Sequence, residues 1–112
     1  MTVRDIQNII ESAAPLGLQE SYDNSGLQVG RENDEVKGIL VCLDITEEVI
    51  EEAARKGCNL VVSHHPLLFK SLRCVSDRTS QQRCVCDAIS KGIALYSAHT
   101  NLDNARGGVN FE

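Results

Sequence analysis

Large aromatic side chains are scarce in this chain: Phe, Trp and Tyr make up 4% of its 112 residues, and tryptophan is absent. A hydrophobic core must therefore be built from Val, Ile, Leu and Ala, which favours helices packed against buried strands. The hydrophobic share of 42% and the charged share of 24% are ordinary for a globular protein. Because the length suits one compact domain, we expect a single α/β domain over residues 1–112.

Clustered positive charge is also missing, since the chain has a net charge of −5 and a pI near 5.1. A protein that binds nucleic acid or an anionic membrane would carry a basic patch, so we expect neither partner. The sequence also lacks a phosphate-binding loop, because Gly107 to Asn110 is not accompanied by the required Lys and Ser or Thr. An anionic substrate would therefore need a metal ion to receive it.

Signal-peptide features and long apolar runs are absent, so we expect a cytoplasmic protein. Five cysteines are an odd number without a secretory context, which predicts reduced thiols in place of disulfides. Cys84 and Cys86 lack the two-residue gap of the common zinc and redox motifs. In a helix, residues two apart do not share a face, so we interpret this pair as small hydrophobic residues and not as metal ligands.

The spacing of apolar residues predicts alternating strands and helices. An amphipathic helix begins after Thr2, a suitable N-cap, and stops before Pro15. Thr46 is the N-cap of a second helix, which ends before Gly57. This second helix is expected near 46–56 and a third near 79–91. Strands are expected near 38–44, 59–63 and 93–97, and the segment at 27–29 is too short for more than an edge strand.

The order strand, helix, strand, helix, strand is typical of a parallel βαβαβ sheet with helices packed on its faces. In such sheets, ligands bind beyond the carboxyl ends of the strands. His64 and His65 follow the second predicted strand, and His99 and Asp103 follow the third. We therefore expect all three histidines of the chain to meet a carboxylate at one edge of the sheet.

The adjacent pair His64 and His65 suggests two metal ions. Consecutive residues of an extended chain point to opposite sides, and Pro66 keeps His65 away from the helical region, so the pair should be splayed. Two ions about 3.5–4 Å apart could each take one imidazole, with Asp103 reaching one or both. The residues alone equally allow a solvated loop end, with Asp103 hydrogen-bonded to its own turn.

Three motifs resemble those of the Nif-three-like family, the dinuclear-metal proteins often labelled GTP cyclohydrolase I type 2. They are YDNSGLQVG at 22–30, VVSHHPLLF at 61–69 and AHTNLDNARGGVN at 98–110, in the order and spacing of that family. Tyr22 stands where members often have Trp. The resemblance covers essentially the whole chain, but only the first half of a family member. It implies that residues 1–112 are the N-terminal portion of a larger Nif-three-like fold.

The resemblance implies a role for each motif residue. His64 and His65 would each bind one of two divalent metal ions (zinc, iron, manganese, nickel or cobalt), and Asp103 would be a carboxylate ligand. The family completes its site with a His and a Glu from a downstream segment that this chain lacks. His99 would be a substrate contact, a hydrogen-bond donor behind the metals or a proton-transfer group, and a purely structural role is an equal alternative. Asp23, Asn24 and Gln28 would shape the cleft.

The implied function is a metal-dependent hydrolase in which a metal-activated water attacks a purine nucleotide such as GTP, with His99 as the catalytic acid or base. The alternative is a metal-binding scaffold or regulatory interaction protein without turnover of its own. The resemblance also implies a homohexamer for the full-length protein. Val109 to Glu112 resembles the start of a helix that the chain does not complete, so we expect a truncated chain that is inactive by itself.

Overall fold

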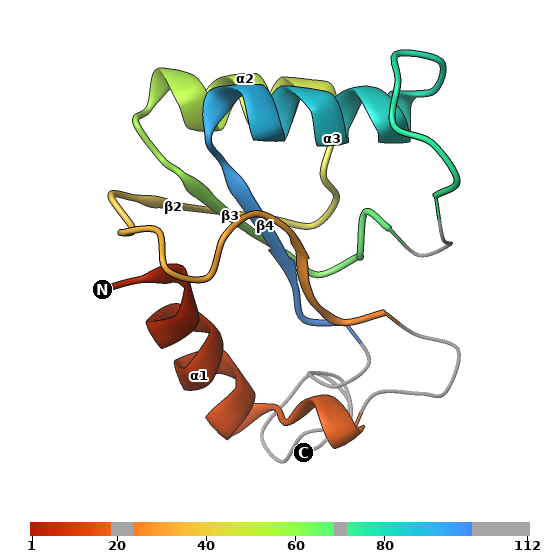
Figure 1. Ribbon diagram of the computed structural model, residues 1–112. Helices are drawn as coiled ribbons and strands as arrows, with labels where there is room; N and C mark the ends of the chain where they lie inside the picture. The colour runs from red at the N-terminus through yellow and green to blue at the C-terminus, as the bar shows by residue number, and fades with distance from the viewer. Residues whose placement is uncertain (19–23, 69–71, 100–112) are drawn as a thin grey trace.

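The structure, a computed structural model, describes residues 1–18, 24–68 and 72–99 (Figure 1). Its elements are, in chain order, α1 (Val3–Ala13), the short 3-10 helix η1 (Leu16–Leu18), β1 (Gly26–Val29), β2 (Ile39–Cys42), α2 (Glu47–Arg55), β3 (Leu60–Ser63), α3 (Ser80–Lys91) and β4 (Ala94–Ser97). Every helix and strand predicted within the described ranges is present, and the helix start expected at Val109 to Glu112 lies outside them. Asp103 and Tyr22 lie outside the described residues.

The four strands form one sheet in the order β1-β4-β3-β2. Strands β2, β3 and β4 run parallel, which confirms the predicted α/β architecture. Strand β1 pairs antiparallel with β4, so the sheet is mixed and not purely parallel. An edge strand hydrogen-bonds one neighbour only, and β1 is not joined to β4 by a single crossover helix, so the crossovers do not fix its direction.

Helix ends follow the capping chemistry of the sequence. Thr2 and Asp5 form a reciprocal capping box at the start of α1. The side chains of Thr46 and Thr79 accept hydrogen bonds from backbone N–H groups in the first turns of α2 and α3. Gly92 ends α3 with a φ of 67°, a left-handed conformation that glycine adopts without strain.

The helices cover the sheet from both sides (Figure 1). Helices α2 and α3 lie side by side on one face, and α1 lies on the other. The first face buries Ile50 and Ala88 against Val61 and Leu95. The second buries an aromatic side chain, Tyr96, beneath α1. The core therefore consists mainly of small aliphatic side chains, as the composition predicts.

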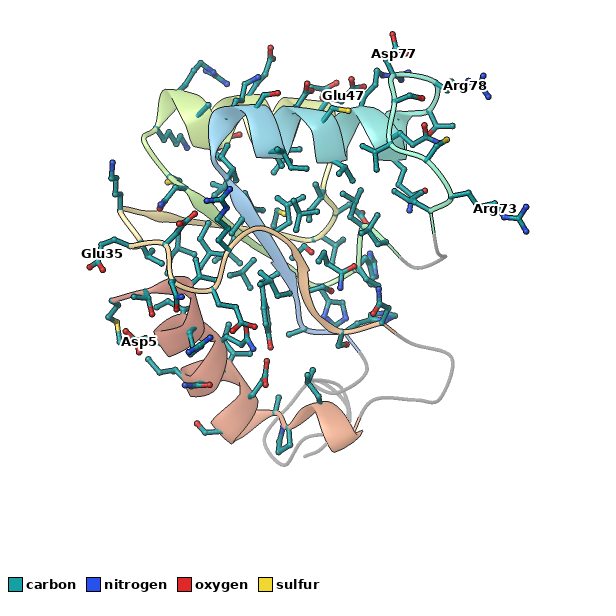
Figure 2. All side chains as sticks on the ribbon, in the orientation of Figure 1. Asp5, Glu35, Glu47, Arg73, Asp77 and Arg78 are labelled. Carbon is teal, nitrogen blue, oxygen red and sulfur yellow. The ribbon has the colours of Figure 1, made fainter. Side chains whose placement is uncertain are left out.

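Charged side chains gather at the periphery. The charged side chains that Figure 2 labels all point away from the sheet. They are Asp5, Glu35, Glu47, Arg73, Asp77 and Arg78. The five thiols are all free, and Cys84, a residue of α3, is buried in the core on the face of the sheet that α2 and α3 cover. No helix in the described ranges is long and apolar enough to cross a membrane.

Candidate metal centre

The carboxyl ends of three strands are level with one another. The parallel register places Cys42 opposite Ser63, and Ser63 opposite Ser97. Backbone hydrogen bonds join the residues after β3 to the end of β2 and the residue after it. The His64 N–H donates to Cys42 O (3.2 Å), and the His65 N–H donates to Leu43 O (3.0 Å). The residues that follow the strands are therefore delivered to one edge of the sheet.

Three histidines converge at this edge. One ring nitrogen from each of His64, His65 and His99 lies within 4.8 Å of the others. Their ring centroids are 5.1 to 5.3 Å apart. The structure thus confirms that all histidines of the chain share one sheet edge and form a group that could hold a metal ion. It does not test the role of Asp103, which lies outside the described residues.

The predicted splay of the adjacent pair is wrong. Strand β3 ends at Ser63, so the alternation of an extended chain does not reach His64 and His65. The chain bends here, and the Ser63 hydroxyl donates to the backbone oxygen of His65 across the bend (2.9 Å). As a result the two rings lie close together, 5.2 Å between centroids and tilted by 48°.

Hydrogen bonds define which ring nitrogen can bind a metal. His64 Nδ1 lies 2.9 Å from the backbone oxygen of Ala98, and His65 Nδ1 lies 2.7 Å from Asp44 Oδ1. A carbonyl oxygen only accepts, so Nδ1 of His64 must carry the proton. With Nδ1 as the donor, a neutral imidazole keeps its lone pair on Nε2. Metal-binding histidines in proteins are commonly held in this way.

Asp44 was not predicted as part of this group. It stands two residues beyond Cys42, just as His65 stands two residues beyond Ser63, so the parallel register brings the two together. The rule that located the histidines, polar residues after the carboxyl ends of parallel strands, applies equally to the Asp that ends the stretch from Gly38 to Asp44.

His99 is held by a different partner. Its backbone N–H donates to the hydroxyl of Ser25 (3.1 Å), which directly precedes β1. Ser25 was also not predicted, and no sequence rule pairs two residues so distant along the chain. The antiparallel pairing of Gly26 with Ser97 explains the contact, because it places the start of β1 beside the end of β4.

Cys42 lies beside the cluster but is not part of it. Its side chain and His64 both line a small cavity of about 130 Å³. Burial, with a smaller contribution from the negative charge of Asp44, raises the pKa of the Cys42 thiol. A protonated thiol is a poor metal ligand, because the thiolate is the binding form. Among the described residues, the group that could hold a metal ion therefore consists of the three imidazoles.

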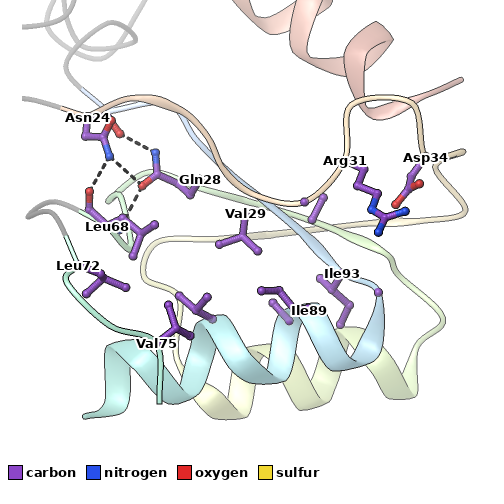
Figure 3. Close-up of a pocket in the computed structure, with 15 residues that line it drawn as sticks. Asn24, Gln28, Val29, Arg31, Asp34, Leu68, Leu72, Val75, Ile89 and Ile93 are labelled. Atoms are coloured by element: carbon purple, nitrogen blue, oxygen red, sulfur yellow. Dashed lines mark hydrogen bonds between the residues drawn. The ribbon is translucent and has the colours of Figure 1, made fainter. Parts of the chain in front are cut away.

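Asn24 and Gln28 brace the segment that follows the adjacent histidines (Figure 3). The Asn24 amide donates to Leu68 O (2.6 Å), and the oxygen of the Gln28 amide accepts the Leu68 N–H (3.1 Å). Gln28 also donates to the Asn24 backbone oxygen (2.7 Å). These bonds support a structural role for the motif. Asp23 lies outside the described residues.

Both amides also lie at one end of a larger cavity of about 1020 Å³ between β1 and α3. Its walls are mainly aliphatic, and Arg31 and Asp34 lie at the other end (Figure 3). None of the three histidines lines this cavity. The histidine edge and the larger cavity are therefore separate features of the fold.

Comparison with known proteins gives the family context. The family described as Duf34/NIF3 (NGG1p interacting factor 3) matches residues 1–112. A GTP cyclohydrolase 1 type 2 homolog of Clostridium acetobutylicum is 44% identical over 110 residues, which are 98% of this chain and 41% of that protein. Its counterpart in Clostridium perfringens is 46% identical over 98% of this chain and 42% of its own length. The chain thus spans less than half of either relative.

Similar solved structures support the same family. A Bacillus cereus protein related to NIF3 superposes with a TM-score of 0.91 at 39% identity, covering 98% of this chain and 30% of that one. Reduced HcgD from Methanocaldococcus jannaschii superposes with a TM-score of 0.88 at 36% identity, covering 96% of this chain and 43% of that one. Together with the match over residues 1–112, these similarities show that the chain belongs to the Duf34/NIF3 family.

Proposed function

We propose that this chain supplies part of a dinuclear metal centre in a metal-dependent hydrolase that acts on a purine nucleotide such as GTP. The observation that carries the proposal is the convergence of His64, His65 and His99 within 4.8 Å at the carboxyl edge of the sheet. His64 and His65 would bind metal through Nε2, because hydrogen bonds engage their Nδ1 atoms. Asp103, which follows β4 in the sequence, would add a carboxylate ligand.

The spacing of the nitrogens is compatible with more than one ion. Two imidazoles on a single tetrahedral zinc ion have nitrogens roughly 3.4 Å apart, given Zn–N bonds of about 2.0–2.1 Å. In this structure one nitrogen of each of the three histidines lies within 4.8 Å of the other two. Small side-chain rotations would close the group around one ion, and the bound also leaves room for two ions about 3.5–4 Å apart. Metal bound here would polarise the group attacked and lower the pKa of a bound water.

His99 is the proposed proton-transfer group. Its ring packs edge-on against both partners, with interplanar angles of 74° to His64 and 81° to His65. Its backbone is fixed by Ser25, so the ring is held beside the two proposed ligands. An imidazole in this place can accept a proton from an attacking water and return it to a leaving group.

The names of the relatives, GTP cyclohydrolase 1 type 2 homologs, support a nucleotide substrate. With a net charge of −5, the chain offers no general attraction for a triphosphate. The phosphates would therefore be received by bound metal ions and not by a basic patch.

A metal-binding scaffold without turnover is the second candidate. The family's description as an interacting factor favours it. The chain would then present the metal edge to a partner protein, and hydrolysis of GTP would not be observed.

Metal content and formate release from GTP, with and without chelator, separate the two candidates. We expect this chain to bind zinc or manganese weakly and without turnover, and the Clostridium perfringens relative to bind metal and release formate. His65→Ala should reduce metal binding, whereas Arg78→Ala, in an exposed loop, should not. Metal without formate release in the relative would favour the scaffold. Tight binding of two ions by this chain, unchanged in His65→Ala, would show that the proposed ligands are wrong.

A further inference from the structure

The contact between Asp44 and His65 has the geometry of a charge-assisted hydrogen bond. Their 2.7 Å separation is at the short end of the range of about 2.7–2.9 Å for such bonds. The backbone supports the contact as well, because the His65 N–H donates to Leu43 O, next to Asp44 (3.0 Å). The pair is therefore held in place by the register of β2 and β3, and does not depend only on two mobile side chains.

We infer that Asp44 is a positioning residue that holds His65 in its Nδ1–H form and so keeps the lone pair on Nε2. The inference rests on the proposed function, in which that lone pair binds a metal ion. A carboxylate behind a metal-binding histidine fixes the ring orientation and the tautomer, and it makes the imidazole a stronger ligand.

The two adjacent histidines differ in their need for such a partner. His64 is half-buried and its Nδ1 is bonded to the carbonyl of Ala98. The side chain of His65 is 44% exposed, so packing restrains its ring less. Free histidine in water prefers the opposite tautomer, with the proton on Nε2. Removing the Asp44 carboxylate should therefore change His65 and leave His64 as it is.

The test uses the metal-free chain with ¹⁵N-labelled histidine at about pH 8, above the range near 6.5 in which free histidine titrates. Long-range ¹H–¹⁵N spectra report which ring nitrogen carries the proton. We expect His65 in the Nδ1–H form in the wild type and a shift toward the Nε2–H form in Asp44→Ala. Asp77→Ala is the matched control, because Asp77 is an exposed aspartate in the loop before α3 that points away from the sheet (Figure 2).

Zinc binding by calorimetry is the second measurement. Asp44→Ala should weaken zinc binding by about 10–100-fold, the range found for residues behind metal ligands. Asp44→Asn should retain more of the affinity, since its amide oxygen still accepts the Nδ1–H. A role limited to stabilising the loop would not produce this order together with a tautomer change.

Failure of the inference about Asp44 and failure of the proposed metal centre would give different results. An Nε2–H form of His65 in the wild type, or an unchanged tautomer in Asp44→Ala, would overturn the inference. If neither the wild type nor the Clostridium perfringens relative binds zinc, the proposed metal centre fails. The tautomer spectra would still decide whether Asp44 positions His65.

Discussion

The hydrogen bond between Tyr96 and Glu11 links the sheet to α1, and its removal has a predictable effect. The Tyr96 hydroxyl donates to Glu11 Oε2 (2.7 Å), and the tyrosine is 1% exposed. A hydrogen bond to a charged partner contributes about 1.5–3 kcal/mol. Glu11 is half-buried, so water can reach its carboxylate once the donor is gone. Tyr96→Phe keeps the ring packing and should therefore lower the free energy of unfolding by about 1–2 kcal/mol.

Alkaline pH provides a second signature of the same bond. Burial, followed by the hydrogen bond to Glu11 and by its charge, raises the pKa of the Tyr96 hydroxyl far above its usual value near 10. Above about pH 10 the unfolded chain releases this proton while the folded chain retains it. The folded state then loses stability as pH rises. Phe has no such proton, so the wild type should lose its advantage over Tyr96→Phe in alkaline solution.

Urea unfolding at about pH 7 and at a series of values above about pH 10 measures both effects. In thermal unfolding at neutral pH, the melting temperature of Tyr96→Phe should fall by roughly 4–8 °C for each kcal/mol of stability lost. Glu11→Gln retains an amide acceptor without the charge and is the matched control, so its loss at neutral pH should be smaller. A loss under about 0.5 kcal/mol in Tyr96→Phe, or a difference from the wild type that does not depend on pH, would refute the reasoning.

Three further changes test the core, the edge strand and the metal edge. Leu95→Ala, at a fully buried position of β4, should reduce the free energy of unfolding by about 2–5 kcal/mol in urea, and a loss below about 1 kcal/mol would contradict the packing described. Gly30→Ala should lower it by about 2–4 kcal/mol in the same assay, because a Cβ there would lie 2.6 Å from Ala94 Cβ at a φ of +122°. Unchanged stability would contradict the close approach of Gly30 to Ala94. Zinc affinity measured by calorimetry should rise between about pH 5 and 7, because imidazole binds metal only when deprotonated, and a flat profile would argue against histidine ligands.

Much of the fold could be predicted because its signals are local. Thr46 and Gly57 enclose α2 within a residue or two, and Thr79 and Gly92 enclose α3. The alternation of these helices with short apolar runs implies the parallel order of β2, β3 and β4. The pairing of β1 with β4 has no such signal, because it joins segments distant along the chain, and its direction depends on packing.

The candidate site, like the fold, could be predicted only in part. Topology alone was enough to bring His64, His65 and His99 to one edge, because the carboxyl ends of parallel strands meet there. The bend that turns the adjacent pair together was not predictable, because the alternation of an extended chain holds only as far as the end of β3 at Ser63. The same topological rule also applies to Asp44, which follows the carboxyl end of β2.

Each histidine is held by an element other than the one that carries it. His64 follows β3 and bonds to Ala98 after β4, while His65 bonds to Asp44 after β2. His99 follows β4 and bonds to Ser25 before β1. No segment of the chain can form this arrangement by itself, because every contact needs two paired strands. The geometry of the cluster therefore depends on the assembled sheet, so metal binding and folding should be coupled.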